Sequence, residues 1–294
     1  MKPKVFLLFT SIALISILEL SCKKQNALSQ NEEVPTTRPI PPCQSSCLSA
    51  ESIGLKHNEV LSFVDNGMTP NDTLTLETLY SAEKNLIKNY FQQNLICNYI
   101  SSWVDDAVTK TNDFYLTIKN QNGGVFSRVT AVLALNDTAG NRLTRIRSMN
   151  PNAISFKEEK FIREILDSIK NIEIDQRCGT YGSLSESLED KWKAQNFDTC
   201  RNEGYISRIM ISTMSNSFTF WINYPYDLSG GRIEAIPLWA ALDIVGAVTA
   251  GLSSIASDIL NGNDVNWANA GVQALLWGAG SSVVGTRWFK NLFK

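Results

Sequence analysis

The only histidine in the chain, His57, is the one side chain whose ordinary pKa suits a general base or a pH sensor near neutrality. It shares a helical spacing with Ile53 and Val60, which places all three on one apolar face. A histidine on such a face more often packs in the core, hydrogen-bonded through its ring, than performs catalysis. We therefore keep His57 as a candidate polar site, assign no catalytic residue and leave open whether the protein is an enzyme.

The remaining patterns exclude several familiar kinds of chemistry. Residues 182–186 (GSLSE) lack the central serine and the second glycine of a hydrolase nucleophile elbow. The chain has neither a phosphate-binding loop nor a dinucleotide fingerprint, and its cysteine spacing offers no zinc ligand cluster. We expect no metal and no cofactor. The net charge of −2, with no run of basic residues, also indicates that the protein does not bind nucleic acid.

The N-terminus carries a targeting signal. Two lysines precede an apolar run over residues 5–18, which is short for a membrane span and typical of a signal peptide. Cys22, preceded by a small residue, resembles the cysteine of a bacterial lipobox, although Glu19 stands where that motif usually has leucine. The resemblance implies that residues 1–21 are removed and that Cys22 is diacylated, so lipid would attach the protein to a membrane. The alternative is cleavage after Ser29, which would release a secreted protein.

Five further cysteines fit an exported protein, because oxidising compartments permit disulfides. Cys178 and Cys200 bracket a polar, loop-like stretch and form the favoured candidate pair. Cys43 and Cys47 could close a small ring after a cluster of prolines. Cys97 lies in an apolar stretch and is expected to be a buried free thiol.

The chain divides into a signal peptide and three further segments. Residues 22–50 are polar and proline-rich, which indicates a flexible tether between the lipid anchor and the folded part. Residues 51–230 carry apolar side chains at helical spacing and predict a mainly α-helical bundle. Ser155 and Glu158 form a capping box at the start of one of its helices. Residues 231–294 predict a Gly/Ala-rich antiparallel helical hairpin.

The hairpin has two interpretations. Its apolar stretches over residues 236–289 are long enough to enter a membrane or to bind a partner helix. Asp243 and Asp258 oppose insertion, because an aspartate at the centre of a membrane helix costs roughly 2.5–3.5 kcal/mol. We favour a soluble, tightly packed helix pair that caps the bundle. The membrane-inserting alternative resembles the hydrophobic hairpins of pore-forming bacteriocins.

The run GLKHNE at residues 54–59 is similar to a His-Asn helix start in uncharacterised exported lipoproteins of Bacteroidota, which also tend to end in a Gly/Ala-rich tail. This resemblance implies export and no particular activity. We expect a cell-envelope lipoprotein at the outer membrane or the periplasmic face, acting as a binding or structural module for an unspecified ligand or protein partner. The alternative function is a toxin-like envelope factor with a membrane-inserting hairpin.

Overall fold

The computed structural model describes residues 48–73, 75–94, 101–121, 123, 128–175, 178–224 and 236–283. All regular structure in these ranges is helical, as the sequence predicts, with nine α-helices and two short 3-10 helices. The elements in chain order are α2 (Ala50–Gly67), η1 (Pro70–Thr73), α3 (Leu76–Gln93), α4 (Ser101–Gln121), α5 (Arg128–Met149), α6 (Phe156–Asp175), α7 (Cys178–Ala194), η2 (Thr199–Arg201), α8 (Tyr205–Asn223), α9 (Ile236–Leu260) and α10 (Trp267–Val283).

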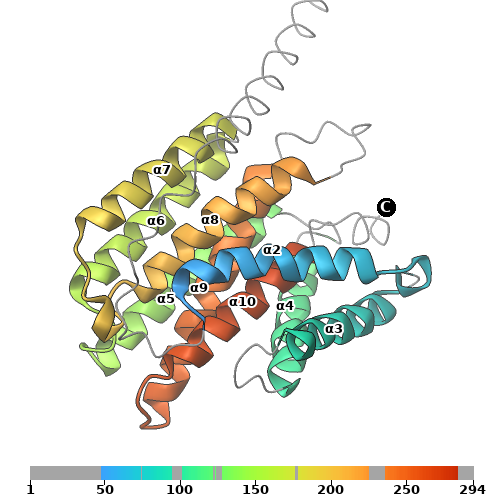
Figure 1. The fold of residues 1–294 in the computed structure, drawn as a ribbon, viewed down its shortest axis with the longest axis horizontal. Coiled ribbons are helices and arrows are strands. Elements are labelled where there is room, and N and C mark those ends of the chain that lie inside the picture. Colours follow the sequence, from blue (N-terminus) through green and yellow to red (C-terminus); the bar gives the residue numbers. More distant parts are fainter. Residues whose placement is uncertain are drawn as a thin grey trace, which may run out of the picture.

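The hairpin of α9 and α10 forms the centre of the fold (Figure 1). Helices α5 and α8 pack on α9, whereas α2 and α4 pack on α10. Helices α6 and α7 lie on one flank, and α3 lies on the other, against α2 and α4. The antiparallel hairpin is confirmed, but it lies inside the bundle and does not cap it. The reason is its apolar surface, since α9 is buried along both of its faces.

Helix α9 is the one described helix that is long and apolar enough to cross a membrane, over Trp239–Leu260. Its most apolar stretch is 89% buried within the fold. Burial of this kind is also what the central helix of a soluble bundle requires. Length and composition therefore do not decide between the two interpretations of the hairpin.

Polar side chains at the first turns explain where several helices begin. Ser49 and Thr75 accept hydrogen bonds from the amides three residues later, at the starts of α2 and α3. At α6, the amide of Glu158 donates to the Ser155 hydroxyl at 3.1 Å, which confirms the serine half of the predicted capping box. Glu158 itself accepts from the amide of Ile206 at 2.9 Å, at the start of α8. Burial raises the pKa of Glu158 to about 7, while its bonds to backbone amides oppose that rise.

Two glycines allow close helix contacts, and one of them, Gly278, belongs to the Gly/Ala-rich hairpin for which the sequence predicts such contacts. The amide of Gly54 in α2 donates to the Ser212 hydroxyl of α8 at 3.3 Å, and a Cβ atom at Gly54 would overlap the Ser212 carbonyl. A Cβ atom at Gly278 of α10 would lie 3.1 Å from the ring of His57. Side chains at these positions would push α2 away from its neighbours.

Two segments are helical where the sequence predicted a loop or left the structure open. The stretch between Cys178 and Cys200, read as a loop, contains helix α7. For residues 125–135 the sequence is compatible with a strand or a helix; the described part of that stretch, from residue 128 on, belongs to helix α5. In both segments apolar residues such as Leu188 and Leu143 are buried in the common core, which favours a helix over the local glycine and serine content.

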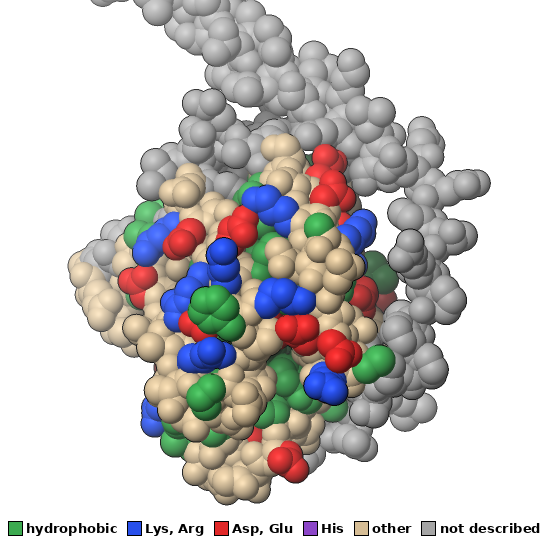
Figure 2. Space-filling model, turned by 90° about the vertical axis from the view of Figure 1, so that its left-hand side faces the viewer, with side chains coloured by type: hydrophobic (Ala, Val, Ile, Leu, Met, Phe, Trp, Pro, Cys, Tyr) green, Lys and Arg blue, Asp and Glu red, His purple; other side chains and the backbone are tan. Residues whose placement is uncertain are grey.

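The face on the α6–α7 side carries Lys and Arg side chains intermixed with Asp and Glu (Figure 2). Ion pairs such as that between Lys191 of α7 and Glu164 of α6 bridge neighbouring helices there, at 2.5 Å. A mixed surface of this kind has no strong field of either sign. The face in view therefore offers no basic patch for a nucleic acid.

Candidate functional site

His57 lies in a fully buried polar cluster at the centre of the fold. Its Nε2 atom is 3.7 Å from Oδ2 of Asp243, and the two side chains are 1% and 0% exposed. The same Asp243 oxygen accepts from the indole of Trp221 at 2.7 Å and from the hydroxyl of Ser217. The His57 Nδ1 atom is 3.0 Å from the side-chain oxygen of Asn58. Helices α2, α8 and α9 thus meet around one aspartate.

This cluster has the residue types of a hydrolytic triad but not its arrangement. The Ser217 hydroxyl donates to Asp243 and not to His57, so the imidazole does not activate this serine. Ser217, His57 and Asp243 are all buried, and no described pocket reaches them. The geometry therefore supports the interpretation of His57 as a core residue.

Most of the candidate cysteines lie outside the described residues. This holds for Cys22, Cys43 and Cys47, and for the side chain of Cys178. Cys200, in η2, is disulfide-bonded. The pairing of Cys178 with Cys200 therefore stays a prediction, as does the acylation of Cys22.

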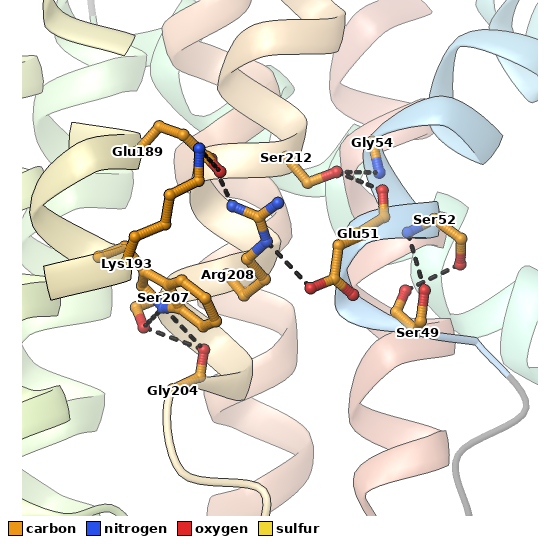
Figure 3. Close-up of polar contacts among 11 residues, drawn as sticks. Ser49, Glu51, Ser52, Gly54, Glu189, Lys193, Gly204, Ser207, Arg208 and Ser212 are labelled. Atoms are coloured by element: carbon orange, nitrogen blue, oxygen red, sulfur yellow. Dashed lines mark hydrogen bonds and ion pairs between the residues drawn. The ribbon is translucent and has the colours of Figure 1, made fainter. Parts of the chain in front are cut away.

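A second polar cluster joins α2, α7 and α8 around Arg208 (Figure 3). Its Nε atom is 3.1 Å from Oε1 of Glu51, its Nη1 atom is bonded to Glu189, and its guanidinium lies 5.0 Å from the ring of Trp192. A shallow pocket of about 280 Å³ borders this arginine. Arg208 pairs with Glu51 and Glu189, and Lys193 pairs with Glu189 at 3.3 Å, so two cations balance two carboxylates. The cluster therefore serves to hold three helices together.

A pocket of about 400 Å³ lies between α4, α5, α9 and α10. Ligand pockets usually range from roughly 300 to 1,000 Å³, so one small molecule would fill it. Its aromatic side chains are Trp103 and Phe114 of α4 and Trp277 of α10, each partly exposed. Small residues of α9, including Ala250 and Ser254, border the same space. The aromatic rings and the small residues together leave room for a flat, compact ligand.

Polar groups with unused hydrogen-bonding capacity line the same pocket. The amide nitrogen of Asn269 donates to the Ser254 hydroxyl at 2.9 Å, whereas its Oδ1 atom is shielded from solvent and has no hydrogen-bond partner among the described residues. One turn along α10, the carboxamide of Gln273 makes no hydrogen bond within the described chain. Buried polar atoms are normally paired, so this oxygen is an acceptor in reserve beside the pocket, and a ligand donor reaches it only if the Asn269 side chain turns toward the pocket. The partly exposed carboxamide of Gln273 is the directly accessible amide.

The charges around the pocket do not cancel. Lys110 and Asp106 pair with each other at 2.7 Å on α4. Arg142 of α5 is half-buried at the pocket and makes no ion pair within the part of the chain that the structure describes. The pocket therefore presents one uncompensated positive charge, on a group that binds carboxylates through two parallel hydrogen bonds.

Sequence reasoning missed the aromatic and cationic side chains of this pocket. The aromatic residues between positions 218 and 226 could line a pocket by their spacing, but core packing is the commoner outcome for such a run, and Phe218, Trp221 and Tyr224 do pack in the core. The sequence feature that could have indicated the pocket is the small-residue face of α9, which includes Ala250, Ser254 and Ser257. That face was interpreted only as a helix contact, whereas part of it borders the pocket. Comparison of the chain with protein-family models, curated proteins and solved structures finds no match.

Proposed function

We propose that the protein is an exported, lipid-anchored binding module of the cell envelope and that it binds a small polar ligand in the pocket between α4, α5, α9 and α10. The observation that carries the binding role is the pocket itself. It combines three aromatic side chains, an unpaired guanidinium and an unpaired buried acceptor in about 400 Å³. Apolar surface with a few convergent polar groups is the usual composition of a ligand site.

Anchoring rests on the sequence around Cys22. A diacylglyceryl group with an additional N-acyl chain supplies more than one lipid chain, which is enough for stable attachment. The polar residues 22–50 would then hold the helical part away from the membrane surface.

Replacement of Cys22 by alanine is expected to abolish acylation and to move the protein from the membrane to the soluble fraction. Metabolic labelling with a palmitate analogue, followed by fractionation and mass spectrometry, measures both effects. The Cys97→Ala variant should keep the label, because only a cysteine at the end of the signal peptide is a substrate for acylation. Unlabelled wild-type protein beginning at residue 30 would contradict the anchor and support secretion.

Replacement of Trp277 by alanine is expected to weaken ligand binding about tenfold or more, since a truncated aromatic contact in a pocket typically costs over 1 kcal/mol. Calorimetric titration with galacturonate, galactose, N-acetylglucosamine and acetate as probes measures the effect. Trp267→Ala on the same helix is the matched control, because Trp267 packs against Tyr205 and lies outside the pocket. Circular dichroism shows whether both variants fold. No binding of any probe by the wild type would contradict this pocket as a site for small polar ligands.

The second candidate function is insertion of the α9–α10 hairpin into a membrane. The apolar helix α9, wrapped by the other helices, favours it. The aspartate cluster opposes it, because insertion would separate Asp243 from Trp221 and Ser217. Dye release from lipid vesicles by the full-length protein would support this alternative, and intact vesicles would contradict it.

A further inference from the structure

The polar side chains of the pocket favour a ligand that carries hydrogen-bond donors. Asn269 Oδ1 is shielded from water and unpaired in the described chain. The oxygen is already unpaired in the free protein, so a ligand that donates to it gains about 1–3 kcal/mol over one that does not. Nearby, the carboxamide of Gln273 and the hydroxyl of Ser257 can both donate and accept. This set of groups fits a ligand with several hydroxyls.

The unpaired guanidinium adds a requirement for negative charge. Arg142 is half-buried, and the other charged side chains that line the pocket among the described residues, Asp106 and Lys110, neutralise each other. One carboxylate matches one uncompensated guanidinium in charge and in fork geometry. A di- or triphosphate would bring at least two negative charges that no second free cation of the pocket balances.

The aromatic side chains add a requirement for apolar surface. Trp103, Phe114 and Trp277 can pack against a ring, and Trp277 and Gln273 lie on the same helix one turn apart. A simple aromatic acid would pack against the aromatic side chains and pair with Arg142, but it would bring no hydroxyl to Asn269. A neutral sugar would satisfy the rings and the amides but would leave Arg142 without an anion.

We infer that the pocket binds a carboxylated sugar, namely a hexuronate or the end of a chain that contains one. This inference rests on the proposed binding function and specifies its ligand. The carboxylate pairs with Arg142, ring hydroxyls bond Asn269, Gln273 and Ser257, and the apolar face of the sugar ring packs against the aromatic side chains.

Galacturonate and galactose make a suitable pair of probes because they differ only in the carboxylate. Wild-type protein is expected to bind galacturonate about tenfold or more tightly than galactose, the effect of one charge-assisted bidentate contact. Arg142→Gln should lower the affinity for galacturonate to that for galactose and leave galactose binding unchanged. Arg145→Gln, on an exposed position of the same helix, should change neither affinity. Titration calorimetry of the full-length wild type and of both variants measures their affinities for the two sugars.

The other outcomes separate the ligand class from the binding function. Equal affinity for galactose and galacturonate, unaffected by Arg142→Gln but lost in Trp277→Ala, would overturn the acidic ligand and leave the binding site in place. Acetate binding as tightly as galacturonate would overturn the sugar and leave a simple anion site. If no probe bound the wild type, the proposed function would fail together with the inference.

Discussion

Replacement of Glu83 by glutamine is expected to stabilise the protein at alkaline pH and to leave its stability at acidic pH nearly unchanged. Glu83, in α3, is fully buried, and neither carboxyl oxygen has a hydrogen-bond partner among the described residues. Burial raises its pKa to about 8, and the nearby Asn112 and Lys84 offset only part of that rise. Glutamine has nearly the shape of the protonated acid and does not ionise.

The direction of this pH dependence follows from how many protons the folded and the unfolded states bind. The unfolded chain releases the Glu83 proton near pH 4.5, whereas the folded chain holds it up to about pH 8. Between these values the folded state binds more protons, so the free energy of unfolding falls as pH rises. Each pKa unit corresponds to about 1.4 kcal/mol, so the loss amounts to several kcal/mol. Below the unfolded pKa the contribution of Glu83 is fully present, and above about pH 8 it is lost.

Urea unfolding of wild type and Glu83→Gln at about pH 4 and about pH 9 measures the difference. Glu158, whose pKa is also raised, titrates in both proteins and therefore cancels in the comparison. Glu77→Gln is the matched control, since Glu77 is an exposed carboxylate on the same helix. A difference between wild type and Glu83→Gln that stays constant with pH would show that Glu83 is not a buried, protonated acid.

The burial of Glu83 is also a feature that the sequence alone does not predict. In the pattern of α3, Glu83 follows Tyr80 and Leu79 and precedes Leu86 and Ile87, so a helical wheel places it near an apolar face. Charged residues at such positions usually reach solvent at the edge of the face. The packing of α4 against α3 places Asn112 beside the Glu83 carboxyl and keeps that carboxyl from solvent. A pattern within α3 does not contain this contact.

Elements with strong local periodicity could be predicted, and contacts between distant segments could not. The helix that contains Phe161 and Ile165 and the Gly/Ala-rich hairpin both follow from spacing alone. The pocket does not, because Trp103, Arg142 and Trp277 come from three helices whose mutual placement no local pattern encodes. The central position of α9 was likewise missed, although its apolar composition around the whole helix pointed to it.

Replacement of Asp243 by leucine is expected to destabilise the fold by about 3–5 kcal/mol, the usual cost of removing one member of a buried, hydrogen-bonded charged cluster. Leucine has the same branched skeleton of heavy atoms, with methyl groups in place of the oxygens, but accepts no hydrogen bond. The indole of Trp221 and the hydroxyl of Ser217 would then lose the oxygen to which both donate, deep in the core. Chemical unfolding followed by circular dichroism measures the change. Asp137→Leu is the control, since Asp137 is 66% exposed and pairs only with Lys170, so its loss should cost below about 1 kcal/mol.

A second substitution tests whether the lost hydrogen bonds cause that instability. Trp221→Phe removes one of the two donors. The loss of stability in the double variant with Asp243→Leu should therefore be smaller than the sum of the losses in the two single variants. Additive effects would show that the aspartate does not act through the indole. Asp243→Leu also makes α9 more apolar, which lowers the cost of placing this helix in lipid. The reduction is smaller than the roughly 3 kcal/mol of a central position, because Asp243 lies near one end of the span Trp239–Leu260. If the hairpin inserts into membranes, the same variant should therefore release dye from vesicles faster than the wild type. A destabilised variant that leaves vesicles intact would assign Asp243 to the stability of the folded bundle alone.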